Sequence, residues 1–215
     1  MQIDEILKQT QVIPVMVIND LDDAIPLANA LISGGLKVLE ITLRTPVALE
    51  AIALIKDALP DSIIGSGTVI DPKTLNDSLN VGVDFMVSPG INNELLNEAK
   101  LTKAKLLPGA ATPTEVMSLM SAGFNSMKFF PAEAAGGTKM LKSIEGPLPQ
   151  VTFYPTGGIN LQNAPAYLEL NNVACVGGTW MLDKSLIQQK NWEQINQLAI
   201  QASQLNVYQS ERKGN

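Results

Sequence analysis

The sequence predicts an α/β protein, a single (β/α)₈ TIM barrel with a short N-terminal helix. Short apolar or β-branched runs alternate along the chain with longer segments of helical periodicity. Eight such runs follow one another at a spacing of roughly 20 to 27 residues. An open doubly wound sheet is the alternative, but Gly65-Ser66-Gly67 lacks the third glycine of a dinucleotide-binding turn and no P-loop motif is present.

The chain length fits one domain that spans residues 1–215. We expect residues 1–11 to contain an N-terminal helix that closes the bottom of the barrel, and residues 208–215 to form a polar tail. The sequence has no interdomain linker and no low-complexity segment.

The expected strands are mostly apolar throughout, which is typical of parallel strands buried on both faces. In chain order they are Ile13–Ile18, Val38–Leu43, Ser62–Gly65, Phe85–Ser88, Lys105–Leu107, Ser126–Phe130, Val151–Tyr154 and Ala174–Gly177.

Amphipathic segments separate these strands and are expected to form helices. They are Asp22–Ile32, Val47–Leu59, Pro72–Leu79, Asn93–Leu101, Pro113–Met120, Lys139–Ile144, Ala164–Leu170 and Trp192–Val207. Small polar residues, several of them followed by proline, favour helix starts at Asp20, Thr45-Pro46, Asp71-Pro72, Asn92 and Thr112-Pro113. Glycines that favour helix ends follow as Gly34-Gly35, Gly82 and Gly123.

The chain contains no histidine, which excludes Ser-His-Asp and Cys-His nucleophile systems and all His-ligated metal sites. General acid–base chemistry must then use Glu, Asp, Lys or Tyr. The single cysteine, Cys175, lies in an apolar run and is expected to be a small buried residue.

The net charge of −6, with dispersed basic residues, gives no basic surface for nucleic acid or for a membrane. The first residues are acidic where a signal peptide would be basic, and no apolar run approaches a membrane span. We therefore expect a cytoplasmic protein.

Lys128 is the first candidate for chemistry, because it lies inside the apolar run Ser126–Phe130. Burial of a charged lysine is costly, which favours the neutral amine that attacks a carbonyl to form a Schiff base. A structural lysine, paired with a buried acid or extended to the strand edge, is the alternative that the residues alone leave open.

Glu40 is the second candidate, because period-two alternation places Val38, Glu40, Thr42 and Arg44 on one side of a strand. If that side faces the barrel interior, Glu40 points into the same space as Lys128 and can transfer protons. A salt bridge is the alternative role. Arg44 ends the strand and is suited to binding a substrate carboxylate, although a surface arginine is the competing interpretation.

Glycines mark the ends of three expected strands. Thr68 follows Gly65-Ser66-Gly67, where glycine allows a ligand to approach the backbone. The last two strands end in Thr156-Gly157-Gly158 and Gly177-Gly178-Thr179. Because the loops after strands seven and eight bind phosphate in many barrels, the pattern indicates a phosphorylated ligand.

With these residues in place, the sequence resembles the 2-keto-3-deoxy-6-phosphogluconate (KDPG) aldolase family, which also includes 4-hydroxy-2-oxoglutarate (KHG) aldolases. The resemblance runs from Pro14-Val15 to Trp180 and depends on six motifs in order. These are Val38–Thr45, Gly65–Val69, Ser88-Pro89-Gly90, Lys128–Glu133, Pro155–Ile159 and Gly177–Trp180.

The resemblance implies a class I aldolase that cleaves KDPG to pyruvate and glyceraldehyde 3-phosphate in the Entner–Doudoroff pathway, without metal or cofactor. It implies a homotrimer, with a phosphorylated keto acid as the ligand. The implied roles are imine formation by Lys128, acid–base catalysis by Glu40, carboxylate binding by Arg44 and Thr68, a substrate channel of Pro89, Phe130 and Thr156, and a phosphate pocket of Gly157, Gly158, Gly178 and Thr179. Family members often have serine where this chain has Thr179.

Related activities remain open. Cleavage of KHG shares the pyruvate half of the reaction, so the motifs do not separate it from KDPG cleavage. The galactonate epimer of KDPG is disfavoured by the wording of strands two and six. A phosphosugar isomerase or epimerase and a non-catalytic sugar-phosphate binder are the alternatives outside the aldolases.

Overall fold

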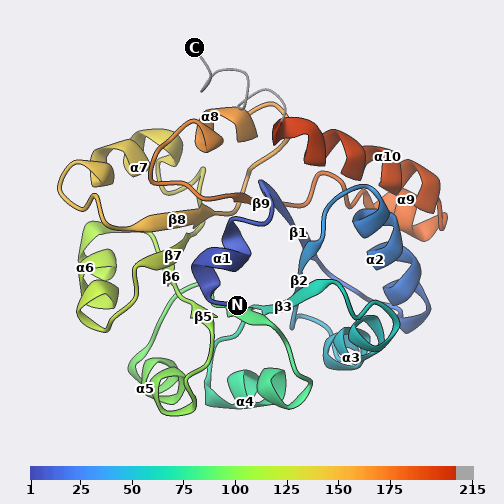
Figure 1. Cartoon of the computed structure of the whole chain (residues 1–215), viewed down its shortest axis with the longest axis horizontal. Helices are drawn as coiled ribbons and strands as arrows, with labels where there is room; N and C mark the ends of the chain where they lie inside the picture. Colours follow the sequence, from blue (N-terminus) through green and yellow to red (C-terminus); the bar gives the residue numbers. More distant parts are fainter. Residues whose placement is uncertain (207–215) are drawn as a thin grey trace.

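Parallel strands form an inner ring, and helices surround it in the computed structural model, which describes residues 1–206 (Figure 1). This arrangement confirms the expected (β/α)₈ barrel. The strands are β1 (Val12–Met16), β2 (Val38–Thr42), β3 (Ile63–Gly67), β4 (Phe85–Val87), β5 (Leu106–Leu107), β6 (Gly109–Ala110), β7 (Ser126–Phe129), β8 (Thr152–Pro155) and β9 (Val176–Gly178).

The ring is built from two hydrogen-bonded sheets, in the orders β5-β4-β3-β2-β1-β9 and β6-β7-β8. β5 and β6 are two halves of the fifth strand, interrupted at Pro108, which has no N–H to donate to a ladder. Parallel bridges from Phe153 to Val173 and from Thr156 to Gly177 join β8 to the segment of β9. The strands therefore close into a barrel of eight.

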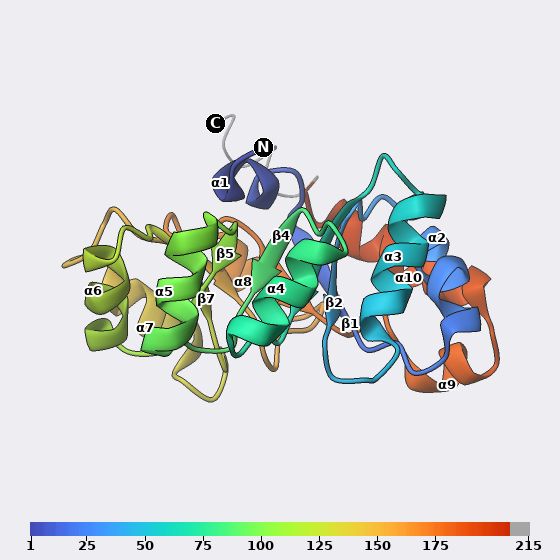
Figure 2. The same cartoon turned by 90° about the horizontal axis from the view of Figure 1, so that it is seen from below.

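Helices follow the strands and cover the outside of the ring, as the view from below also shows (Figure 2). They are α1 (Ile3–Leu7), α2 (Ala24–Ser33), α3 (Ala48–Ala58), α4 (Pro72–Asn80), α5 (Asn93–Thr102), α6 (Pro113–Ser121), α7 (Gly137–Glu145), α8 (Ala164–Leu168), α9 (Lys184–Gln188) and α10 (Trp192–Ser203), with short 3₁₀ helices η1 (Leu21–Asp23) and η2 (Gln204–Asn206). None of the helices in residues 1–206 is long and apolar enough to cross a membrane.

Three expected helix starts are confirmed by their capping side chains. Asp71, Asn92 and Thr112 each accept a hydrogen bond from the backbone N–H three residues later, which satisfies one of the free N–H groups of the first turn. These caps fix where α4, α5 and α6 begin.

One expected boundary was wrong. α3 begins at Ala48 and not at Thr45-Pro46, because the Thr45 hydroxyl instead donates to the carbonyl of Ile18, at 2.6 Å. The expected start at Asp20 is confirmed, because its side chain caps the 3₁₀ turn η1, which continues directly into α2 at Ala24. The short helix α9 was not expected, and the proposed tail at 208–215 lies outside the described residues.

The barrel interior is a separate apolar cluster from the layer between strands and helices. It contains the strand residues Ile13, Val38, Phe85, Val87, Leu107 and Tyr154, and Cys175 just before β9. α1 lies across the middle of the ring in Figure 1 and at one end of it in Figure 2. Ile6 and Leu7 of this helix belong to the interior cluster, and Asp4 accepts a hydrogen bond from Ser126 at the start of β7. The expected helix therefore closes the amino-terminal end of the barrel.

Candidate active site

Lys128 lies in the middle of β7 with its side chain directed into the barrel. Its neighbours Met127 and Phe129 pack in the outer apolar layer, which follows from the alternation of side chains along a strand. The Lys128 side chain is only 5% exposed, and its Nζ lies 3.4 Å from Oε1 of Glu40. The same Nζ lies 5.2 Å from the centre of the Phe130 ring. The amine is therefore held among apolar and aromatic groups with one carboxylate beside it.

Glu40 faces the interior from β2, as period-two alternation predicted. Val38 packs in the interior cluster, whereas Leu39 and Ile41 pack outside. The Glu40 carboxylate is fully buried and lies next to Gly67 on the neighbouring strand β3. A Cβ atom at Gly67 would lie 2.2 Å from Oε1 of Glu40, so a larger residue would displace the carboxylate from Lys128.

Tyr154 on β8 is a member of this cluster that the sequence reasoning missed. It pairs with Lys128 in the strand register, and its hydroxyl donates a hydrogen bond to Oε2 of Glu40, at 2.9 Å. Its ring centre lies 5.9 Å from Lys128 Nζ. The alternation of β8 carried a weak signal, because Tyr154 is two residues from Thr156 and shares its face.

Arg44 and Thr68 lie side by side beyond the carboxyl ends of β2 and β3. The Arg44 Nε donates to the Thr68 Oγ1 across 3.2 Å, and the Arg44 side chain is exposed. Thr68 has a φ of 61°, which is rare for a β-branched residue. The guanidinium therefore retains free donors for an anion at the open end of the barrel.

Pro89, Phe130 and Thr156 follow β4, β7 and β8, so all three lie at the carboxyl end of the ring. Thr156 is buried, whereas Pro89 and Phe130 are half-buried. These predicted channel residues therefore lie around the carboxyl-end opening above Lys128. Among them, the Phe130 ring lies close to the Lys128 amine.

The two glycine pairs differ in backbone geometry. Gly157 and Gly158 have φ values of 107° and 77°, so both require glycine. The carbonyl of Gly157 accepts a hydrogen bond from the N–H of Glu133, at 3.1 Å, which ties this loop to the segment after β7. Gly178 ends β9, and the exposed Thr179 follows it at the same mouth.

Glu133 gives the first loop a second support. It accepts a hydrogen bond from Tyr167 on α8, and a Cβ atom at Gly158 would lie 2.7 Å from the Cγ of Glu133. On the other side of the mouth, Asp183 caps α9 by accepting from Ser185 and Leu186. The Asp183 side chain therefore occupies two of the first backbone N–H groups of α9.

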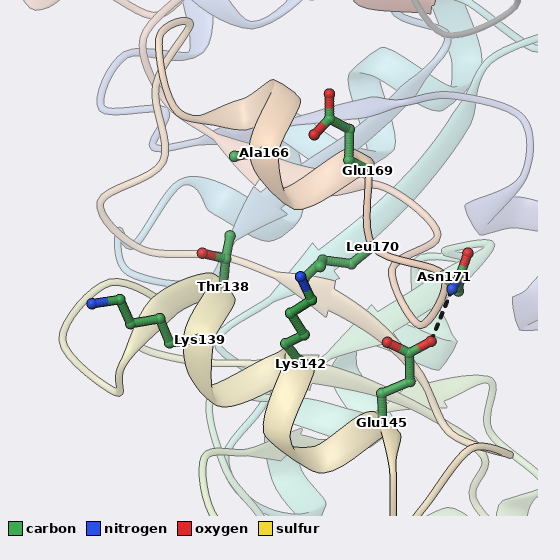
Figure 3. A pocket seen from close by; sticks show the side chains of 8 residues that line it. All are labelled: Thr138, Lys139, Lys142, Glu145, Ala166, Glu169, Leu170 and Asn171. Atoms are coloured by element: carbon green, nitrogen blue, oxygen red, sulfur yellow. Dashed lines mark hydrogen bonds between the residues drawn. The ribbon is translucent and has the colours of Figure 1, made fainter. Parts of the chain in front are cut away.

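Within residues 1–206 no group of three or more Cys, Asp and Glu side chains is arranged to hold a metal ion. A groove of about 490 Å³ on the outer surface also lacks a link to Lys128, because α7, α8 and the turn after α8 line it (Figure 3). It contains both lysines and glutamates, and Glu145 accepts a hydrogen bond from Asn171 at 3.0 Å. This groove therefore lies apart from Lys128 and Glu40.

Comparison with known proteins agrees with this geometry. Residues 3–198 match the family model described as KDPG and KHG aldolase. The chain is 45% identical to the 2-dehydro-3-deoxy-phosphogluconate aldolase of Dickeya dadantii, with 93% of each chain covered. It is 42% identical to the KHG/KDPG aldolase of Escherichia coli, again over 93% of each chain.

A solved structure extends the agreement to three dimensions. The KDPG aldolase of Legionella pneumophila, captured with pyruvate as a covalent carbinolamine, superposes with a TM-score of 0.92 at 48% identity. The alignment covers 94% of this chain and 98% of that one. The chain belongs to the KDPG and KHG aldolase family.

Proposed function

We propose that this protein is a class I aldolase that cleaves KDPG into pyruvate and glyceraldehyde 3-phosphate through a Schiff base on Lys128. One observation carries the proposal: a buried lysine amine 3.4 Å from a buried carboxylate, at the inner end of an open barrel mouth. Relatives with both KDPG and KHG activity support cleavage of 4-hydroxy-2-oxoglutarate as a second reaction.

Lys128 would begin the reaction by attacking the C2 ketone of the substrate. The Nζ–C2 bond forms, the ketone oxygen takes a proton to give a carbinolamine, and loss of water gives the protonated imine. Glu40 is placed to move these protons, because its Oε1 lies within reach of the same nitrogen. The relative captured as a carbinolamine with pyruvate supports this first half of the mechanism.

The protonated imine then accepts the electron pair of the C3–C4 bond. Glu40, through a water molecule, removes the C4 hydroxyl proton as that bond breaks, and the aldehyde leaves. The remaining enamine takes a proton at C3, and hydrolysis of the imine releases pyruvate and the free amine. Because the iminium is the electron sink, this sequence needs no metal ion.

Binding groups fit the two ends of such a substrate. Arg44 and Thr68 would hold the carboxylate next to C2, and a guanidinium suits this role because it binds a carboxylate with two parallel hydrogen bonds. Gly157, Gly158, Gly178 and Thr179 would hold the phosphate at the opposite side of the mouth. Pro89, Phe130 and Thr156 would line the passage between them.

The location, oligomeric state and ligand class that we propose are those expected for the family. We propose a cytoplasmic homotrimer with one barrel domain per chain. The ligand would be a phosphorylated keto acid, with neither nucleic acid nor membrane as a partner. A phosphosugar isomerase or epimerase would use the same phosphate loops but would not form an imine.

Borohydride reduction in the presence of pyruvate tests the central step. Intact-protein mass spectrometry should show one pyruvyl adduct, and peptide mapping should assign it to Lys128. Lys128→Arg should abolish the adduct, whereas Lys105→Arg, which changes an exposed lysine just before β5, should retain it. An adduct on another lysine, or activity that EDTA removes and a divalent ion restores, would overturn the proposal.

The role of Glu40 has its own test. Glu40→Gln should lower kcat by about 10²- to 10⁴-fold, the usual contribution of general acid–base catalysis. Full turnover by this variant would remove the proton-transfer role from Glu40 while leaving the imine on Lys128 in place.

A further inference from the structure

Tyr154 is the buried polar group closest to the proposed chemistry that has no role in it so far. Its hydroxyl donates to Oε2 of Glu40 at 2.9 Å, while Oε1 of the same carboxylate lies 3.4 Å from Lys128 Nζ. Tyr154 and Glu40 are both fully buried. One carboxylate oxygen is therefore bound by tyrosine, and the other faces the amine.

The hydrogen bond between Tyr154 and Glu40 fits only because two neighbouring strand positions are glycines without side chains. A Cβ atom at Gly67 on β3 would lie 2.2 Å from Oε1 of Glu40, and a Cβ atom at Gly177 on β9 would lie 2.4 Å from the Tyr154 hydroxyl. Any other residue at either position would push on the pair. The two strands thus lack side chains at the points where the tyrosine and the carboxylate meet.

The Tyr154 hydroxyl is a donor across the whole working pH range. Burial, followed by the negative charge of Glu40, raises the pKa of Tyr154 well above its usual value. The phenol therefore stays protonated and keeps its proton available for the hydrogen bond to Glu40. What it can do is fix the direction of the carboxylate.

We propose that Tyr154 is a positioning residue, whose hydroxyl holds Oε2 of Glu40 so that Oε1 faces Lys128 and the substrate carbons. The inference rests on the function proposed above, in which Glu40 transfers protons. A carboxylate that rotates freely would spend time with neither oxygen at the reacting carbon, and small misplacements of a catalytic group are costly. Proton transfer at carbon should depend on Tyr154 more than imine formation does.

Tyr154→Phe removes only the hydroxyl and keeps the ring, so two half-reactions can be compared in the intact protein. The first is borohydride trapping of pyruvate, which reports imine formation by Lys128. The second is deuterium exchange at the methyl group of pyruvate in D₂O, which reports proton transfer between Glu40 and C3. We expect exchange and kcat to fall by about 10- to 100-fold, the range of a hydrogen bond to a charged group. The final extent of trapping shows whether Lys128 forms the imine, not how fast it does so. This extent and KM should therefore stay close to the wild-type values.

Ser78→Ala is the matched control, because it also removes a fully buried hydroxyl but does so on α4, outside the barrel interior. This variant should leave trapping and exchange unchanged. Equal exchange in Tyr154→Phe and wild type would overturn the proposal. Parallel losses of trapping, exchange and thermal stability would also overturn it, because they would indicate a purely structural tyrosine.

Gly177→Ala keeps the proposal testable if Tyr154→Phe does not fold. The added methyl group would press on the Tyr154 hydroxyl and equally on Thr156 Oγ1. Exchange is therefore measured at saturating pyruvate, where it should fall while trapping persists, and unchanged exchange would count against positioning. Wild-type protein separates the two levels of inference. If the wild-type protein neither traps nor exchanges pyruvate, the proposed aldolase function is wrong. If the wild type does both but Tyr154→Phe exchanges equally well, only the positioning role of Tyr154 is wrong.

Discussion

The Nε of Arg44 donates a hydrogen bond to the Oγ1 of Thr68 across 3.2 Å, and this contact joins the ends of β2 and β3 at the barrel mouth. The two residues are 24 positions apart in the chain, but they become neighbours because β2 and β3 pair in parallel register. The threonine thereby orients a guanidinium that would otherwise move freely in solvent.

Arg44→Lys should raise KM for KDPG and for KHG by about tenfold or more, with a smaller effect on kcat. An ammonium group cannot make two parallel hydrogen bonds to a carboxylate, and both substrates carry the same keto-acid end. Steady-state kinetics with the two substrates checks this. A decrease in kcat at constant KM would place Arg44 in the chemical step instead.

Thr68→Gly should raise the free energy of unfolding by about 0.5 to 1 kcal/mol while lowering activity. Glycine adopts a φ of 61° without the steric cost that a side chain incurs there, but Arg44 loses its partner. Urea unfolding and KM measure the two effects.

Lys103 supplies the control for the stability gain. It ends α5 with a φ of 54°, so Lys103→Gly should stabilise the protein by a similar amount and leave KM unchanged. If both variants lose activity equally, the loss in Thr68→Gly does not come from Arg44.

Thr179→Ala should lower kcat/KM for KDPG by about 10- to 100-fold, because a hydroxyl donor to a charged phosphate is lost. KHG has no phosphate, so its cleavage should change little. Thr179→Ser should keep most of the KDPG activity. Equal losses on both substrates would show that Thr179 does not contact the phosphate.

The free energy of unfolding should decrease at alkaline pH because of two ionisable groups buried in the barrel interior, Cys175 and Tyr154. Burial, followed by the charge of Glu40, raises the pKa of Cys175 above its usual value of 9.0. The unfolded thiol therefore ionises first, so the free energy of unfolding is fully present below pH 9 and decreases as the pH rises above it. Tyr154 adds the same trend from about pH 10.

Cys175→Ala should remove the first of these contributions. Between pH 9 and 10 the unfolding free energy of wild type should fall more steeply than that of the variant, by about 1 kcal/mol per pH unit. The buried tyrosines should leave a shallower fall in the variant. Urea titrations over this range measure both slopes. Parallel curves would mean that the thiol ionises equally in the folded and unfolded states.

Lys128 and Glu40 could be predicted because a charged residue inside an apolar strand is rare, and β alternation then determines which way it points. For Tyr154 the alternation with Thr156 was too weak a signal, since a tyrosine within an apolar strand is not unusual. Its hydrogen bond to Glu40 joins residues 114 positions apart, and such closeness depends on the closed ring.

Helix starts could likewise be predicted where neighbouring residues determine them, but not where a contact with a distant part of the chain does. The starts of α4, α5 and α6 were predictable because their caps act within three residues. The start of α3 was not, because the Thr45 hydroxyl binds a carbonyl 27 residues earlier in the chain. α9 has only five residues, too few to show helical periodicity.

In the described part of the chain, helix α1 covers the amino-terminal end of the ring. A substrate would therefore approach Lys128 from the carboxyl end, past Arg44 and Thr179, and products would leave by the same end. The aldehyde fragment would lie between the bound three-carbon fragment and solvent, so it must depart first. Cleavage would then follow a fixed order of release, and the reverse condensation would require pyruvate to arrive before the aldehyde.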